Sequence, residues 1–131
     1  MASELSILAI YAFVIVLTLV VQLLLALPQF GLPYLASSRD EGRVLSGMAG
    51  RAERCYNNSV LAMAMFAPAV LALAAMDAFT AKSQLACQVF LVARIAYAPA
   101  YWLGIPWART LIWVVGLLMT LWLYLMVLGA A

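Results

Sequence analysis

The sequence predicts an all-α integral membrane protein whose chain crosses the bilayer four times as a small helical bundle. Three observations support this fold class. The 131 residues are 69% hydrophobic and only 9% charged, their mean hydropathy is +1.10, and they include four long apolar stretches. A soluble domain carries roughly 25% charged residues, so this chain cannot give itself a polar surface.

Each apolar stretch can cross a hydrocarbon core of about 30 Å, which takes about 20 helical residues. Because lipid offers no hydrogen bonds to the backbone, each stretch must be a helix. We predict one domain, residues 1–131, with spans at about residues 5–27, 56–76, 85–103 and 110–128. The first stretch has no positively charged leader and exceeds the core of a signal peptide, so we expect it to be retained.

The connections differ in length. Residues 28–50 form a long connection whose Arg-Asp-Glu-x-Arg cluster we expect in water or at the headgroups. The other two are short, which makes successive spans antiparallel neighbours. Pro68 and Pro99 fall inside spans, where each marks either a tolerated kink or a functional bend. The second span is rich in alanine, which allows close helix packing and makes it a candidate for the centre of an oligomer.

The distribution of basic residues predicts the orientation, because Lys and Arg collect on the cytoplasmic side. The first connection and the start of span two contain Arg39, Arg43, Arg51 and Arg54, the third connection contains Arg109, and the opposite side has only Lys82. We therefore expect the first and third connections in the cytoplasm and both termini on the other side. The short connections and the absence of a targeting segment favour a bacterial inner membrane.

Several classes of function are excluded. The net charge of +2 is too small and too scattered for nucleic-acid binding. The chain has no histidine, which excludes a Ser-His-Asp triad and a His-ligated metal, and we predict no metal site. Cys55 and Cys87 are expected near opposite membrane faces, too far apart for a disulfide.

A polar stripe runs through the third span. A charge inside the membrane costs at least about 2.5 kcal/mol, so Arg94 needs a partner in the bundle interior or a wet cavity. Tyr97 and Tyr101 follow Arg94 at i+3 and i+7, so all three side chains share one helical face. A structural pair between Arg94 and Asn58 and a functional role for Arg94 are both compatible with this pattern.

A second stripe begins span two. Arg51, Arg54, Asn58 and Leu61 follow the spacing i, i+3, i+7, i+10 and share a face if the helix begins by Arg51. Together the two stripes can enclose a crevice for an anion, with Arg109 at its mouth. The alternative is that Arg51 and Arg54 extend toward lipid phosphates.

These residues resemble the MAPEG family, the membrane-associated proteins in eicosanoid and glutathione metabolism, as a bacterial-type member. The resemblance rests on Arg51-x-x-Arg54-x-x-x-Asn58, on Ala93-Arg94 followed by Tyr101, and on the "GIPWAR" turn that ends at Arg109. It implies a four-helix protomer that forms a homotrimer, with glutathione bound between subunits on the cytoplasmic side. A hydrophobic small molecule and membrane lipids are the other expected partners.

The resemblance also implies roles for individual residues. The implied glutathione-binding residues are Arg51, Arg54, Asn58, Arg94, Tyr97 and Tyr101, and the implied catalytic residue is Arg109. Arg94 would support the site from within the bundle, and Arg109 would stabilise the glutathione thiolate. A guanidinium suits that task because it stays charged and lowers the pKa of a nearby thiol.

One departure weakens the transfer of function. Where many catalytic members have a glutamate three residues after the asparagine, this chain has Leu61. The sequence thus supports a glutathione-dependent transferase or peroxidase acting on lipophilic electrophiles, or else a non-catalytic protein of the same fold that binds lipid or a partner. A small exporter of cationic drugs is disfavoured, because Glu4 and Asp77 lie at span ends and the charge inside a span is positive.

Overall fold

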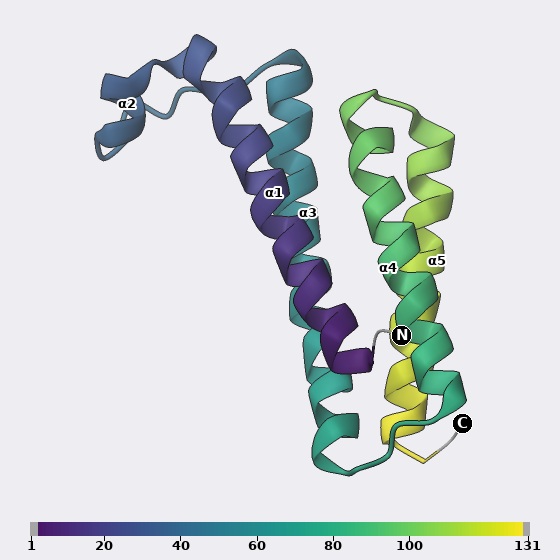
Figure 1. The fold of residues 1–131 in the computed structure, drawn as a ribbon. Coiled ribbons are helices and arrows are strands. Elements are labelled where there is room, and N and C mark those ends of the chain that lie inside the picture. The colour runs from purple at the N-terminus through teal and green to yellow at the C-terminus, as the bar shows by residue number, and fades with distance from the viewer. Residues whose placement is uncertain (1–2, 130–131) are drawn as a thin grey trace.

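The computed structural model describes residues 3–129, and these form four long helices and one short helix without a strand (Figure 1). The helices are α1 Glu4–Phe30, α2 Leu32–Ala36, α3 Gly47–Ala75, α4 Ala81–Trp102 and α5 Pro106–Val127. The four long helices are each long and apolar enough to cross a membrane. The predicted all-α membrane bundle is confirmed.

The bundle consists of two helix pairs. Helix α1 runs beside α3, α4 runs beside α5, and the pairs touch through contacts of α1 with α4 and of α3 with both α4 and α5 (Figure 1). The connections 31–46 and 103–105 lie at one end, and the connection 76–80 and the end of α5 lie at the other (Figure 1). The first and third connections therefore share one end of the bundle.

Helix α3 begins earlier than the hydropathy pattern predicts. It starts at Gly47 rather than near residue 56, and its 29 residues are about 43 Å long at 1.5 Å per residue. A hydrocarbon core of about 30 Å cannot contain that length. The polar first turns, which contain Arg51 and Arg54, therefore extend past the apolar layer. They are helical, which is the condition for Arg51, Arg54 and Asn58 to share one face.

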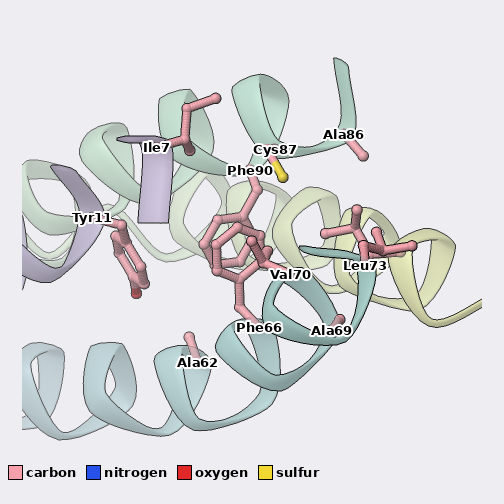
Figure 2. Packing of buried hydrophobic residues seen from close by; sticks show 11 residues of the cluster. Ile7, Tyr11, Ala62, Phe66, Ala69, Val70, Leu73, Ala86, Cys87 and Phe90 are labelled. Carbon is pink, nitrogen blue, oxygen red and sulfur yellow. The ribbon is translucent and has the colours of Figure 1, made fainter. Parts of the chain in front are cut away.

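An aromatic cluster forms the centre of the core. The rings of Phe66 from α3 and Phe90 from α4 stack with centroids 3.8 Å apart. Tyr11 from α1 meets both rings edge-on, at centroid distances of 6.3 Å and 5.1 Å (Figure 2). All three side chains are buried. One aromatic residue from each of three helices thus fixes how α1, α3 and α4 pack, through close contact rather than an aqueous hydrophobic effect.

Both prolines predicted within spans lie inside helices. Proline lacks the N–H of a normal helical turn, so the carbonyls before it need other partners. Near Pro68, the Tyr124 hydroxyl of α5 donates to the Met65 carbonyl oxygen at 2.5 Å. This contact joins α5 to α3 one residue after Ala64, whose carbonyl is the one that Pro68 leaves without its helical donor.

The buried carboxylate of Glu4 joins the start of α1 to the start of α4, at the end of the bundle that contains the connection 76–80. The Ser83 hydroxyl donates to Glu4 Oε2 at 2.6 Å, and Glu4 is only 5% exposed. Ser83 and Thr80 form the capping box that begins α4. A negative charge at the first turn of a helix is stabilised by the helix dipole. Glu4 therefore both accepts a hydrogen bond and complements the start of α4.

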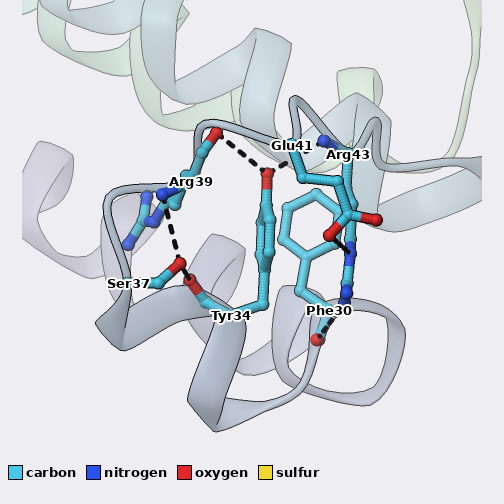
Figure 3. A network of polar contacts seen from close by, with 6 residues as sticks. All are labelled: Phe30, Tyr34, Ser37, Arg39, Glu41 and Arg43. Atoms are coloured by element: carbon cyan, nitrogen blue, oxygen red, sulfur yellow. Dashed lines mark hydrogen bonds and ion pairs between the residues drawn. The ribbon is translucent and has the colours of Figure 1, made fainter.

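The connection 31–46 contains the short helix α2, which the sequence did not predict, and it projects sideways from the bundle (Figure 1). The Tyr34 ring organises this segment (Figure 3). Its hydroxyl accepts from the Arg43 backbone N–H at 2.9 Å, and the Arg43 guanidinium lies 4.4 Å from its ring centroid. Arg43 also pairs with Glu41 at 2.8 Å. These charged side chains are exposed, as predicted for the Arg-Asp-Glu-x-Arg cluster.

Glu4→Ala tests the link between α1 and α4. We expect it to lower the free energy of unfolding by about 1.5–3 kcal/mol, the usual contribution of a hydrogen bond to a charged group. Glu41→Ala is the matched control, since an exposed ion pair contributes less than about 1 kcal/mol. Equilibrium unfolding in mixed micelles, followed by circular dichroism, measures both variants. Equal effects of the two substitutions would contradict the role of Glu4.

Candidate functional site: a polar cleft between three helices

A polar cleft of about 440 Å³ lies between α3, α4 and α5. Helix α3 supplies Arg54, Asn58 and Leu61 of the predicted stripe in span two. Helix α4 supplies the two tyrosines of the predicted stripe in span three, and the first turns of α5 complete the wall. The lining residues are Arg54, Asn57, Asn58, Leu61, Tyr97, Tyr101, Arg109, Thr110 and Trp113. The structure therefore brings part of each stripe and Arg109 to one cavity, without Arg51 and Arg94 among its lining residues.

The geometry of α3 explains which of its side chains reach the cleft. Arg54 and Asn58 are four residues apart, so they lie one above the other on the same helical face. Leu61 continues this face, is 62% exposed, and forms an apolar part of the wall. The cleft is thus polar near the start of α3 and becomes apolar one turn further along.

Helix α5 brings Arg109 to the cleft through a tight turn. Gly104 adopts a φ of +70°, a conformation that a residue with a side chain rarely tolerates. Pro106 then occupies the first turn of α5, where its missing N–H costs nothing. The Arg109 guanidinium lies 4.7 Å from the centroid of the Tyr101 ring.

Two tyrosine rings of the cleft wall lie between two arginines. The Arg94 guanidinium lies 4.1 Å from the Tyr97 ring centroid, the rings of Tyr97 and Tyr101 are 5.6 Å apart, and Arg109 covers Tyr101. A cation over a ring face is stabilised by about 0.5–2 kcal/mol, more where water is excluded. The two tyrosines thereby connect a buried arginine with one at the cleft.

Arg94 lies behind the cleft wall and is 3% exposed. Its Nη2 donates to Asn58 Oδ1 at 2.9 Å and to Ser59 Oγ at 3.2 Å. Its Nε donates to the Tyr11 hydroxyl at 3.1 Å, and that hydroxyl donates to the Ser59 carbonyl at 3.1 Å. The predicted contact with Asn58 is confirmed. Among residues 3–129 no carboxylate pairs with Arg94, so hydrogen-bond acceptors and the Tyr97 ring stabilise its charge.

Arg51 is the predicted site residue that the structure places outside the cleft. Its Nε donates to the Trp102 carbonyl oxygen at 2.8 Å, and its side chain lies against Gly104. It thus satisfies an orphan carbonyl at the end of α4 with a positive charge, a favourable arrangement at a helix C-terminus. This position fits a link between α3 and α4.

Sequence reasoning missed two kinds of site residue. Asn57 and Trp113 line the cleft; Asn57 is adjacent to a predicted site residue, and Trp113 lies one turn after Arg109. Tyr11 and Ser59 surround Arg94 from within the bundle. A tyrosine in the middle of an otherwise apolar span is a signal for such a partner, although its helix neighbours cannot be deduced from spacing.

The comparison with known families matches this architecture. The family model described as the MAPEG family matches residues 5–129. The chain belongs to the MAPEG family. No curated protein and no solved structure matches it. The match covers nearly the whole chain and supports an integral membrane protein of the family of glutathione and eicosanoid metabolism, and it leaves the exporter interpretation without support.

The cleft of this MAPEG protein is rich in hydrogen-bond donors and has no carboxylate among its lining residues. Arg54 and Arg109 are cationic, and Asn57, Asn58 and the two tyrosines can donate as well. Such a cavity favours an anionic ligand with several acceptor oxygens. No group of three or more potential metal ligands occurs in the described part of the chain. Cys55 and Cys87 are both free, as predicted, and both are buried.

Arg51 and Arg54 belong to one predicted stripe, but in the structure Arg51 bonds to α4 whereas Arg54 is exposed at the cleft. In this MAPEG protein we expect Arg51→Ala to lower the free energy of unfolding by about 1–2 kcal/mol, because it removes a charged hydrogen bond between α3 and α4. Arg54→Ala removes an exposed side chain and should change stability by less than about 0.5 kcal/mol. Unfolding of both variants in the same micelles makes the comparison. A larger loss from Arg54→Ala would contradict this assignment.

Proposed function

We propose that this protein is a membrane-bound, glutathione-dependent transferase or peroxidase that acts on lipophilic electrophiles. The observation that carries the proposal is the convergence of Arg54 and Arg109, from different helices, on one cleft whose lining contains no carboxylate. Glutathione carries two carboxylates and a thiol. In this proposal Arg54 and Asn58 bind its carboxylate and backbone oxygens, and Tyr101 contacts the peptide.

Arg109 is the proposed catalytic residue. A free thiol has a pKa near 8.5, so only a few per cent is thiolate at pH 7, and a nearby guanidinium raises that fraction. In the transferase reaction the thiolate sulfur forms a bond to an electrophilic carbon while the leaving group departs with the electron pair of the broken bond. In the peroxidase reaction two glutathione thiols are oxidised to the disulfide, and the hydroperoxide is reduced to an alcohol and water.

The apolar side of the cleft suits a hydrophobic second substrate. Leu61 is 62% exposed and Trp113 is 38% exposed, and both line the cleft beside its polar part. A lipophilic electrophile dissolved in the bilayer can approach along these side chains. In this proposal the polar co-substrate binds at the headgroup end of the cleft and the apolar substrate binds on the membrane side.

The proposal includes an assembly and an orientation. We propose a homotrimer with glutathione bound at the subunit interfaces, in a bacterial inner membrane, with connections 31–46 and 103–105 in the cytoplasm. The openness of the cleft along α3, where Leu61 and Met65 are exposed, supports a neighbouring subunit at this face. The alanine-rich sequence of α3 allows the close approach that such an interface needs.

One observation favours a second candidate function. Leu61, an apolar residue, lines the cleft at the position where the family resemblance implies a glutamate that would hold the ammonium group of glutathione. A non-catalytic MAPEG protein that binds an anionic lipid or a partner needs the arginines but no acidic residue. Saturable binding of glutathione in detergent, together with turnover of an electrophile, would exclude this candidate.

Arg109→Ala tests the catalytic proposal. We expect it to lower kcat/KM for a chloronitrobenzene electrophile by about 100-fold or more, the usual effect of removing a group that stabilises developing negative charge. The bound thiol should lose its lowered pKa, so the rate profile should shift to higher pH. Lys82→Ala is the matched control, since it removes a positive charge at the opposite end of the bundle. An unchanged kcat/KM in Arg109→Ala would refute the role.

Leu61→Glu tests whether residue 61 lies close to the ammonium group of bound glutathione. A carboxylate at this position would face a cavity that has none, and we expect the Kd for glutathione to fall about 10-fold, or about 1.4 kcal/mol. Leu61→Gln provides the uncharged control. Isothermal titration of the three proteins measures the difference. A Kd that is the same in all three would show that residue 61 does not meet the ligand.

A further inference from the structure

The contact between Arg94 and Asn58 determines which way the asparagine amide faces. A guanidinium carries five N–H donors and no acceptor. Nη2 of Arg94 lies 2.9 Å from the Asn58 side chain, so the atom facing Arg94 must be the amide oxygen. The orientation of an amide is often ambiguous, but here the chemistry of the partner settles it.

We propose that Arg94 is a positioning residue that holds the Asn58 amide with its NH2 group toward the cleft, where it donates to an acceptor oxygen of the ligand. Asn58 lines the cleft, and its Nδ2 has no hydrogen-bond partner within residues 3–129. Arg94 itself is not among the lining residues. It therefore acts on the ligand through Asn58. This inference deepens the proposed function, and its ligand-binding test rests on that function.

Arg94 is itself held from several directions. Tyr11 from α1 accepts from Nε at 3.1 Å, Ser59 from α3 accepts from Nη2 at 3.2 Å, and the Tyr97 ring lies under the guanidinium. Gly116 of α5 adds a close approach, since a Cβ built there would lie 3.5 Å from Arg94 Cδ. A side chain that α1 and α3 hold by hydrogen bonds against a ring of its own helix keeps one orientation, and the Asn58 amide takes its orientation from it.

The consequence is that Asn58, like Arg54 and Arg109, offers hydrogen-bond donors to the cleft. If the Asn58 amide were reversed, its oxygen would face a cleft that Arg54 and Arg109 also line, and it would offer an acceptor to a ligand that itself brings acceptors. With Oδ1 bound to Arg94, Asn58 adds a donor to the two cations. The buried charge of Arg94 thus favours acceptor-rich, anionic ligands without touching them.

The orientation can be measured without any ligand. The chain has two asparagines, Asn57 and Asn58, so selective 15N-asparagine labelling gives two side-chain NH2 signals in the nuclear magnetic resonance spectrum. Arg94→Met keeps an unbranched side chain that reaches about as far as Nε and removes the donors. We expect the Asn58 signal to shift in Arg94→Met while the neighbouring Asn57 signal stays in place. An Asn58 signal that does not move would overturn the proposal.

Glutathione titrations separate positioning from a structural role. Asn58→Asp keeps the Arg94 contact but faces the cleft with an acceptor, so we expect a Kd at least 10-fold higher with undiminished thermal stability; a purely structural Asn58 would leave the Kd unchanged. Arg94→Met should raise the Kd about 10-fold. Tyr11→Phe loses the Nε contact and the hydrogen bond to the Ser59 carbonyl but keeps the contact of Arg94 with Asn58, so it should change the Kd less than about 2-fold.

The two proposals fail in different ways. If the parent protein binds no glutathione, the proposed function is wrong and the Asn58 signal alone decides whether Arg94 positions the amide. If the parent binds glutathione and Asn58→Asp binds it equally well, the proposed function stands and the positioning role is refuted.

Discussion

The structure depends on keeping one positive charge inside a membrane bundle. Arg94 is 3% exposed and has no carboxylate partner in the part of the chain that the structure describes. An unpaired charge in this environment is stable only when polar groups surround it. Tyr11, Asn58 and Ser59 supply those groups from α1 and α3, and Tyr97 supplies a ring face. The requirements of one side chain therefore fix the relative positions of three helices.

The same requirement shapes the cleft. Every polar group that stabilises Arg94 does so with its acceptor side, because a guanidinium only donates. Groups that also reach the cleft, Asn58 above all, must then face it with their donor side. The neighbouring cations Arg54 and Arg109 add to this polarity. Bundle stability and ligand preference are two results of one electrostatic arrangement, so they cannot be varied independently at Arg94.

Hydropathy was enough to predict that four helices are long and apolar enough to cross a membrane, but not that α3 begins as early as Gly47. Helical spacing also placed Arg54 and Asn58 correctly on one face. It failed for Arg51, which has the same spacing but bonds to the Trp102 carbonyl at the end of α4. It also could not find Tyr11, because contacts between helices depend on rotation and register that a single sequence does not reveal. Helix α2 was missed because five residues carry too little periodicity.

Leu61 shows how a shared scaffold permits functional change. It lies one turn from Asn58, and the hydrogen bonds that hold Arg94 do not involve it. A substitution at this position therefore alters what the cleft presents to the positive end of a ligand, while the bundle and the donor groups stay as they are. Function resides in the site rather than in the fold. Under the proposed function, the donor side of the cleft is tied to the core through the contact of Asn58 with Arg94, whereas residue 61 can be substituted without removing that contact.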